Sequence, residues 1–270
     1  MTLAARLAAL DATLRSYERV LVAFSGGADS AFVLAAAVEA LGAANVVAAT
    51  AVSPSLPAEE LADAAAFAAS LGVRHETPRT DEMSRDGYRA NGADRCFFCK
   101  AELLDTLRPL ADALGIATIA TGTNADDAVA GFRPGIRAAA ERGAVTPLRD
   151  NGFTKNDVRE ASRAMGLRTW DKPAAACLAS RVAYGIEVSP ERLARVERAE
   201  RAARSWLAHH GIDVRDLRVR DLGATARIEV DRDLVGAVAG IEDVVRAAGF
   251  AAVEVDLRGF RSGSMNEALT

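Results

Sequence analysis

The 270-residue chain lacks several features that would place it in common classes of protein. It contains no run of about eighteen apolar residues, so the sequence predicts no segment that spans a membrane. Residues 1–14 show no polar cleavage region and continue as an amphipathic pattern, so we interpret them as a helix and not as an export signal. The formal net charge is −4, which argues against a nucleic acid as the partner.

Cysteine is also scarce, with only Cys96, Cys99 and Cys177 in the chain. An odd number of cysteines without an export signal indicates a reducing compartment, so we expect a cytoplasmic protein whose thiols serve chemistry. Cys96 and Cys99 form a Cys-x-x-Cys pair, which is typical of a redox pair, of half a zinc site or of two ligands of an iron–sulfur cluster. A zinc site would need a fourth ligand, and the chain has only three histidines.

A glycine-containing loop is the most informative motif. The apolar run 20–24 is followed by Ser-Gly-Gly-Ala-Asp-Ser and then by a helical pattern, an order that predicts a strand, a tight loop and a helix. Backbone N–H groups at a helix N-terminus bind anions, and two glycines let the backbone close around a phosphate. The loop lacks the Gly-Lys-Ser/Thr ending of a Walker motif. An ordinary glycine turn between a core strand and a helix is the alternative.

The pattern of apolar runs predicts an α/β fold with a parallel sheet covered by helices on both faces. We expect strands over 20–24, 45–52 and 117–121, within a first domain that comprises residues 1–184. From residue 185 onward the pattern changes to a helix over 189–209, strands over 214–220, 226–230 and 251–257, and a helix over 234–248. This order predicts a small α+β domain over residues 185–270.

Two segments of the first domain have no regular pattern. Residues 74–99 are polar and contain the Cys-x-x-Cys pair, so we expect a surface loop there, followed by a helix over 101–114. Residues 169–181 are also irregular, and they contain Cys177.

The loop Ser25–Ser30 resembles the SGGxDS loop of the ATP pyrophosphatases, which cleave ATP between the α- and β-phosphates. The resemblance implies that ATP and Mg²⁺ bind here, with Asp29 beside the cation in a catalytic role. The pyrophosphate would be held by the remaining loop residues, Ser25, Gly26, Gly27 and Ser30.

The turn that follows the strand over 117–121 resembles the second nucleotide-site motif of the same superfamily. Gly122, Asp126 and Asp127 are the residues that carry this resemblance, and the two carboxylates would serve magnesium or the pyrophosphate. A helix cap followed by exposed acids is the alternative. Arg133 is a candidate phosphate contact, and Ser53 is a candidate for the adenine end by its position after the second strand.

Residues 172–181 have the sequence Lys-Pro-Ala-Ala-Ala-Cys-Leu-Ala-Ser-Arg. When this stretch is taken with the loop Ser25–Ser30, nearly the whole chain is similar to the LarE family of ATP-dependent sulfur transferases, which mature the nickel-pincer cofactor of lactate racemase. The resemblance implies that ATP adenylates a carboxylate of pyridinium-3,5-biscarboxylic acid mononucleotide. A sulfur at Cys177 would then displace AMP. The partners implied are this mononucleotide and a sulfide source, with no nucleic acid and no membrane, and we expect a homo-oligomer.

The resemblance also implies two sources of sulfur. Family members with a lone cysteine at the position of Cys177 sacrifice that side chain's own sulfur, whereas members with an additional Cys-x-x-Cys pair hold a [4Fe-4S] cluster. We favour a cluster on Cys96, Cys99 and Cys177 over the sacrificial mechanism. A tRNA thiolase is a competing interpretation, and so is an ATP-sensing module, which would not need Cys177.

Arg218 and Arg220 alternate along a predicted strand, so both side chains project from one face and could bind a phosphate. A solvated strand face is the alternative. By resemblance to the family we expect these arginines, with Ser180 and Arg181, to bind the phosphate of the mononucleotide.

Overall fold

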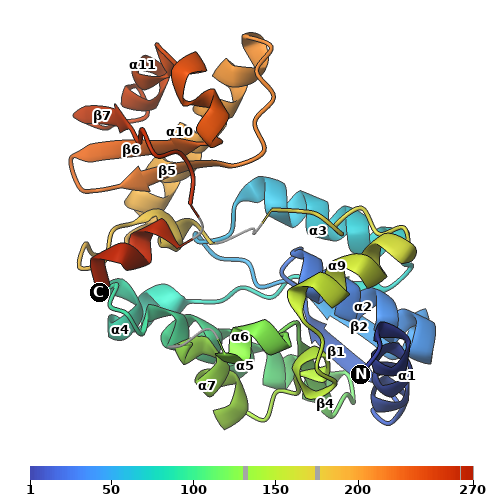
Figure 1. The fold of residues 1–270 in the computed structure, drawn as a ribbon. Helices are drawn as coiled ribbons and strands as arrows, with labels where there is room; N and C mark the ends of the chain where they lie inside the picture. Colours follow the sequence, from blue (N-terminus) through green and yellow to red (C-terminus); the bar gives the residue numbers. More distant parts are fainter. Residues whose placement is uncertain (130–132, 174–176, 262, 270) are drawn as a thin grey trace. The chain divides into compact units, whose positions relative to one another are not determined.

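The computed structural model describes residues 1–129, 133–173, 177–261 and 263–269 (Figure 1). The chain divides into two compact units: unit 1 comprises residues 1–82 and 96–175, and unit 2 comprises residues 83–95 and 176–270. Among the described residues, no helix is long and apolar enough to cross a membrane.

Unit 1 is built on a four-stranded sheet in the order β3-β2-β1-β4, and all of its pairings are parallel. Val20 of β1 pairs with Val46 of β2 and with Thr118 of β4, which fixes the register. This confirms the parallel α/β fold that the apolar runs predicted. The strands are β1 (Val20–Ala23), β2 (Val46–Ala49), β3 (Arg74–Glu76) and β4 (Thr118–Thr121).

Helices cover both faces of this sheet (Figure 1). Val20 and Val22 of β1 pack in one apolar cluster with α1, α2, α3 and α9, while Leu21 and Ala23 pack in a second cluster with α5 and α7. Successive strand residues therefore face opposite layers, as strand geometry requires. The helices of unit 1 are α1 (Leu3–Arg15), α2 (Ala28–Leu41), α3 (Ala58–Ser70), α5 (Arg95–Ala113, which belongs to unit 1 from Cys96 onward), α6 (Ala125–Val129), α7 (Pro134–Glu141), α8 (Pro147–Asp150) and α9 (Lys155–Ala164), with a 3-10 turn at Ala43–Asn45. A second 3-10 turn, Glu82–Ser84, lies at the boundary between the units.

The segment over 74–99 is more regular than its polar composition predicted. It contains β3 and the short α4 (Asp86–Arg89), and α5 begins at Arg95 and not near residue 101. Cys96 and Cys99 therefore lie in the first turns of a helix, so the expectation of a loop was wrong for both. The helical pattern was hidden because apolar and polar residues are mixed at this end of α5, whose buried residues Leu104 and Leu107 come later.

Unit 2 contains a three-stranded sheet in the order β5-β6-β7, in which β5 and β6 are antiparallel while β6 and β7 are parallel. The helix predicted over 234–248 is in fact a 3-10 turn and a short helix, because Gly240 adopts a left-handed conformation that ends the first and precedes the second. The other elements are as expected in type. They are α10 (Pro190–His209), β5 (Leu217–Asp221), β6 (Thr225–Val230), α11 (Ile241–Arg246) and β7 (Ala252–Val255), with 3-10 turns at Leu178–Arg181, Arg232–Ala237 and Ser264–Leu269.

The boundary between the units differs from the expected one at residues 184 and 185, because residues 83–95 and 176–184 belong to unit 2. The buried amide of Asn91 donates to the carbonyl oxygens of Ala183 at 2.8 Å and Ile186 at 2.9 Å. The buried guanidinium of Arg95 donates to the carbonyl oxygen of Ala179 at 2.9 Å. These bonds hold the segment before the Cys-x-x-Cys pair to the segment after Cys177, a pairing of distant residues that local patterns do not reveal.

Candidate functional site

The loop between β1 and α2 is closed by its own serine. The buried Ser30 hydroxyl accepts from the backbone N–H of Ser25 at 3.2 Å and donates to the carbonyl oxygen of Gly27 at 3.1 Å. Gly26 has a φ of +75°, which disfavours any residue with a side chain. Gly27 is the N-cap residue of α2 and has no side chain that could satisfy the first N–H groups of the helix. The loop therefore has the geometry of an anion site, with Ser25 exposed at its rim.

Asp29 lies in the first turn of α2 and carries an ion pair to a residue far away in the sequence. Its Oδ2 atom is 2.6 Å from Nζ of Lys155, the first residue of α9. Its Oδ1 atom is buried and has no hydrogen-bond partner within the described part of the chain. Because an unsatisfied buried oxygen is costly, this atom is suited to a ligand such as a divalent cation.

The turn after β4 lies directly against the same loop. A Cβ atom on Gly122 would be 2.7 Å from the backbone nitrogen of Ser30 and 3.0 Å from the carbonyl carbon of Asp29. Such distances are too short for any side chain, so only glycine permits this approach. The two motifs that the sequence singled out are thereby brought into one site at the carboxyl ends of β1 and β4.

The acids that follow Gly122 both have structural partners. Asp127 and Asn124 form reciprocal bonds between side chain and backbone at the start of α6, so the helix cap of the alternative interpretation is present. The other oxygen of Asp127 is 3.6 Å from the guanidinium of Arg133. Asp126 is exposed and accepts from the backbone N–H of Lys155 at 2.7 Å. Lys155 therefore contacts acids of both motifs.

Ser53 follows β2 at the same edge of the sheet. Its hydroxyl donates to the buried carboxylate of Glu82 and accepts from the backbone N–H of Ser55 at 3.2 Å. Ser53 is thus held in place by a carboxylate that the sequence had given no reason to single out.

The Cys-x-x-Cys pair also lies near the second motif, within unit 1. Burial lowers the pKa of Lys100, while the neighbouring Cys99, Cys96 and Asp127 oppose this lowering. Because Lys100 interacts electrostatically with both cysteines and with Asp127, the first turns of α5 lie close to α6. Cys96 is exposed and Cys99 is half-buried.

Two thiols three residues apart on one helical turn can serve as two ligands of an iron–sulfur cluster. Cys177 belongs to unit 2, so neither unit holds all three cysteines. Among the described residues no three Cys, His, Asp or Glu side chains gather in a group that could hold a metal ion. The redox alternative also requires the pair at a helix N-terminus, but in a different fold from the parallel α/β fold seen here.

In unit 2, the backbone of Cys177 is fixed by two of the expected phosphate ligands. Its carbonyl oxygen accepts from the Ser180 hydroxyl at 2.8 Å and from the Arg181 guanidinium at 3.0 Å. Arg181 is buried and forms an ion pair with Glu200 of α10 at 2.9 Å. Cys177 itself is half-buried; residues 174–176, which precede it in the motif, lie outside the described residues.

Arg218 and Arg220 are not on a solvated face, because both are buried, at 6% and 5% exposure. Arg220 forms an ion pair with Glu229 of β6 at 2.7 Å. Burial, reinforced by the charge of Arg181, lowers the pKa of Arg218 to about 10. We call Arg181, Glu200, Arg218, Arg220 and Glu229 the arginine cluster; the carboxylate of Asp216 also acts on Arg218.

Sequence reasoning missed four residues of these two sites, namely Lys155, Glu82, Glu200 and Glu229. Each is separated from its partner by many residues, and each belongs to a helix, turn or strand whose pattern is ordinary.

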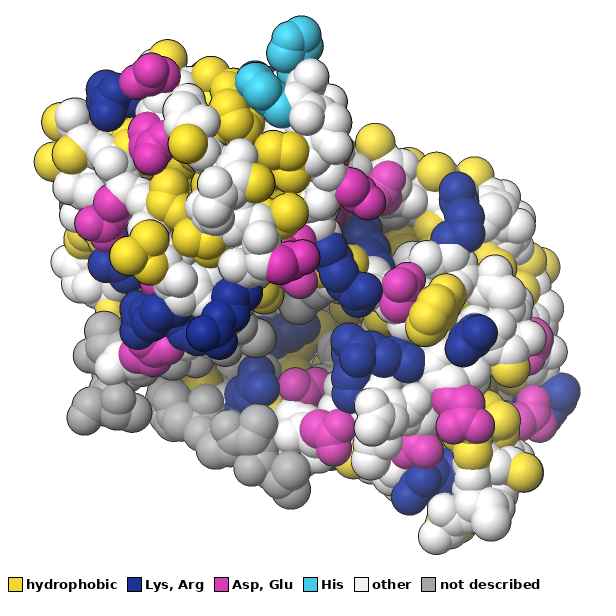
Figure 2. Space-filling model, turned by 45° about the horizontal axis from the view of Figure 1, so that its top comes forward, with side chains coloured by type: hydrophobic (Ala, Val, Ile, Leu, Met, Phe, Trp, Pro, Cys, Tyr) yellow, Lys and Arg dark blue, Asp and Glu magenta, His cyan; other side chains and the backbone are white. Residues whose placement is uncertain are grey.

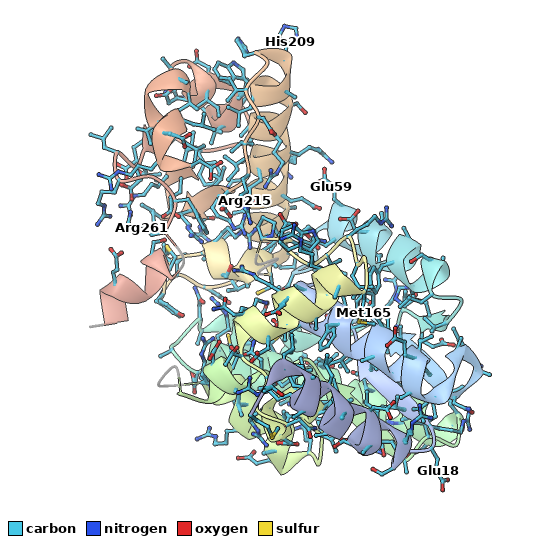
Figure 3. The ribbon with its side chains drawn as sticks, turned by 45° about the vertical axis from the view of Figure 1, so that its right-hand side comes forward. Glu18, Glu59, Met165, His209, Arg215 and Arg261 are labelled. Atoms are coloured by element: carbon cyan, nitrogen blue, oxygen red, sulfur yellow. The ribbon has the colours of Figure 1, made fainter. Side chains whose placement is uncertain are left out.

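Figure 3 shows α9 with Met165 at its C-terminal end, opposite the end that carries Lys155. Figure 2 shows basic and acidic side chains interspersed on the face that it draws.

Comparison with known proteins places this geometry in a family. The NAD synthase family profile matches residues 8–91, which include the loop Ser25–Ser30. An uncharacterized protein of Synechocystis sp. is 44% identical over 94% of this chain and 94% of its own length. An uncharacterized protein of Methanocaldococcus jannaschii is 25% identical over 91% of this chain and 92% of its own.

The pyridinium-3,5-bisthiocarboxylic acid mononucleotide synthase of Lactiplantibacillus plantarum is 36% identical over 100% of this chain and 96% of its own length. Because this similarity extends over the whole chain, the chain belongs to the LarE family and is an ATP-dependent sulfurtransferase.

Proposed function

We propose that this protein adenylates a carboxylate of pyridinium-3,5-biscarboxylic acid mononucleotide and converts it to a thiocarboxylate. The observation that carries the proposal is the connection of Cys177 to the arginine cluster through Arg181, which bonds to the Cys177 carbonyl oxygen at 3.0 Å. A cysteine beside buried cations is what a sulfur transferase with a phosphorylated substrate needs. A protein that only binds ATP has no use for either feature.

ATP would bind at the loop between β1 and α2, with its phosphates at the N–H groups of the first turn of the helix. Ser25, Gly26, Gly27 and Ser30 would surround the pyrophosphate. The buried, unpartnered Oδ1 of Asp29 supports a role for this carboxylate as a ligand of Mg²⁺, which would neutralise phosphate charge when bound. Arg133, Asp126 and Asp127 would complete the site from the β4 side.

The proposed reaction has two steps. A substrate carboxylate oxygen attacks the α-phosphorus of ATP, the bond from that phosphorus to the β-phosphate oxygen breaks, and pyrophosphate leaves. A sulfur nucleophile then attacks the carbonyl carbon of the mixed anhydride, and the carbon–oxygen bond to AMP breaks. Activation is required because a carboxylate is a poor electrophile, whereas AMP is a good leaving group.

The arginine cluster would bind the phosphate of the mononucleotide. The lowered pKa of Arg218, about 10, means that its charge is destabilised by burial and by neighbouring cations. A bound phosphate would relieve this cost and could accept hydrogen bonds from more than one guanidinium. Ser180 is close enough to contribute, because its carbonyl oxygen is 3.4 Å from Nη1 of Arg220.

The sulfur would be delivered at Cys177. We propose that Cys96, Cys99 and Cys177 together hold a [4Fe-4S] cluster, which when bound would supply a replaceable sulfide. The position of Cys96 and Cys99 on one turn of α5 supports this assignment, as does the absence of any other cysteine from the sequence. Loss of the Cys177 sulfur itself is the competing mechanism.

A first prediction concerns the contact between the two ATP motifs. The substitution Gly122→Ala should slow pyrophosphate release about 100-fold, because its Cβ atom would displace the first turn of α2. Pyrophosphate is measured with ATP and the mononucleotide present, and thermal unfolding monitors the fold. Gly236→Ala is the control, because no atom lies within 4 Å of the Cβ it would add. Wild-type rates in Gly122→Ala would contradict the assignment.

A second prediction concerns the arginine cluster. The substitution Arg218→Met should weaken binding of the mononucleotide by about 10- to 100-fold and leave ATP binding unchanged, because it removes a buried cation while the Arg181–Glu200 and Arg220–Glu229 ion pairs keep both partners. Isothermal titration calorimetry measures both affinities. Arg227→Met on the adjacent strand is the matched control, since Arg227 pairs with the half-exposed Glu254. If Arg218→Met and Arg227→Met bind the mononucleotide equally well, the cluster has only a structural role.

A third prediction separates the two sources of sulfur. Anaerobically reconstituted protein should contain iron and acid-labile sulfide, and the double substitution Cys96→Ser and Cys99→Ser should remove both. After several turnovers, mass spectrometry should find Cys177 intact. Conversion of Cys177 to dehydroalanine in step with product, or full activity of the double variant, would favour the sacrificial mechanism.

A further inference from the structure

Lysine is rare in this protein, which has three lysines and thirty arginines. All three lysines belong to unit 1 and adjoin its two motifs. Lys155 pairs with Asp29, and Lys100 interacts electrostatically with Asp127. Lys172 pairs with Glu60, whose Oε2 lies 3.7 Å from the position of a Cβ atom on Gly26. Arginine supplies the positive charge everywhere else, so lysine is confined to the surroundings of the candidate ATP site.

Lysine and arginine differ in ways that matter at such a site. The ammonium group is a compact point charge with three donors on a flexible stem, and it can move between partners. A guanidinium is a planar fork that fits a fixed carboxylate or phosphate pair. A lysine that contacts the loop is therefore suited to a change of partner during the reaction.

Lys155 is the lysine that is best placed for this change. Its Nζ atom is 2.6 Å from Oδ2 of Asp29, and its backbone N–H donates to Asp126 at 2.7 Å. The Thr154 cap and its reciprocal bond with Asp157 fix the start of α9, so the Lys155 stem begins from a rigid position. The side chain is 35% exposed, which leaves the ammonium accessible to a ligand in the loop.

We propose that Lys155 is the phosphate lysine of this loop and that it exchanges partners when ATP binds. Without nucleotide it neutralises Asp29. When ATP and a divalent cation bind, the cation takes Asp29 and the ammonium contacts the pyrophosphate group. The loop itself lacks the lysine of a Walker motif, and α9 supplies one from 126 positions away in the sequence. This inference rests on the proposed ATP chemistry.

The role of Lys155 in the first step follows from the charges. When the bond between the α-phosphorus and its bridging oxygen breaks, the electron pair stays on the leaving pyrophosphate. The ammonium would donate a hydrogen bond to that oxygen and stabilise the added negative charge, and no proton need be transferred. The exchange also keeps Asp29 neutralised until the cation arrives, because an unpaired carboxylate at this partly buried position would be costly.

The test uses two binding measurements that do not depend on turnover. Lys155→Met should weaken the affinity for pyrophosphate about 30-fold, because a charge-assisted contact is lost. The same variant should bind Mn²⁺ several-fold more tightly in the absence of nucleotide, since Asp29 is no longer paired. Calorimetry measures the first and electron paramagnetic resonance the second. Arg159→Met, which removes an exposed charge one turn further along α9, should change neither.

Lys155→Arg keeps a charge beside Asp29 and should therefore keep the weak Mn²⁺ binding of the wild type. If Lys155→Met does not fold, the same measurements are made on Lys155→Gln. Equal pyrophosphate affinity in Lys155→Met and the wild type would overturn the phosphate role, and unchanged Mn²⁺ affinity would overturn the exchange. A wild-type protein that binds neither pyrophosphate nor ATP would instead contradict the proposed function.

Discussion

The contact between Gly122 and the first turn of α2 is the constraint on which the candidate ATP site depends. With a Cβ atom at this position only 2.7 Å from the Ser30 nitrogen, the β4 turn and the loop between β1 and α2 could not occupy their present places. The contact brings Asp126 and Asp127 of α6 to the same edge of the sheet as Asp29 of α2, although the two helices follow different strands of the parallel sheet. Lys155 then joins Asp29 and Asp126 from a third element. Three segments distant in sequence thus share one polar site.

Unit 2 differs from the candidate ATP site of unit 1 because its charged groups are buried. Arg181, Arg218 and Arg220 are each less than a tenth exposed, and two of them depend on the carboxylates of Glu200 and Glu229. Buried ion pairs contribute little net stability because desolvation offsets their attraction. Stability alone is therefore a weak explanation for burying three guanidiniums together, and we propose an anionic ligand for them. Arg181 also links the cluster to the carbonyl oxygen of Cys177.

The sequence was sufficient to predict the features that are local. The apolar runs predicted the parallel sheet, and the Ser-Gly-Gly motif predicted the strand, loop and helix around Asp29. The arginines at 218 and 220 do alternate on one strand, but their burial depends on Glu229 and on Arg181, which local periodicity does not report. Likewise, Cys96 lies on a helix that the sequence did not predict at this position. The pattern was missed because the buried face of α5 begins only later in that helix. Lys155 could not be found at all, since its partner is 126 positions away.

The central claim is that a substrate carboxylate is adenylated before sulfur enters, and oxygen-18 tracing tests it most directly. The mononucleotide is labelled in its carboxylates and turned over anaerobically by the wild-type protein with ATP and a sulfide source, and the AMP is analysed by mass spectrometry. The account predicts one oxygen-18 in AMP for each thiocarboxylate formed, because the oxygen that attacks the α-phosphorus leaves with AMP. Unlabelled AMP, or label in inorganic phosphate together with ADP, would contradict it.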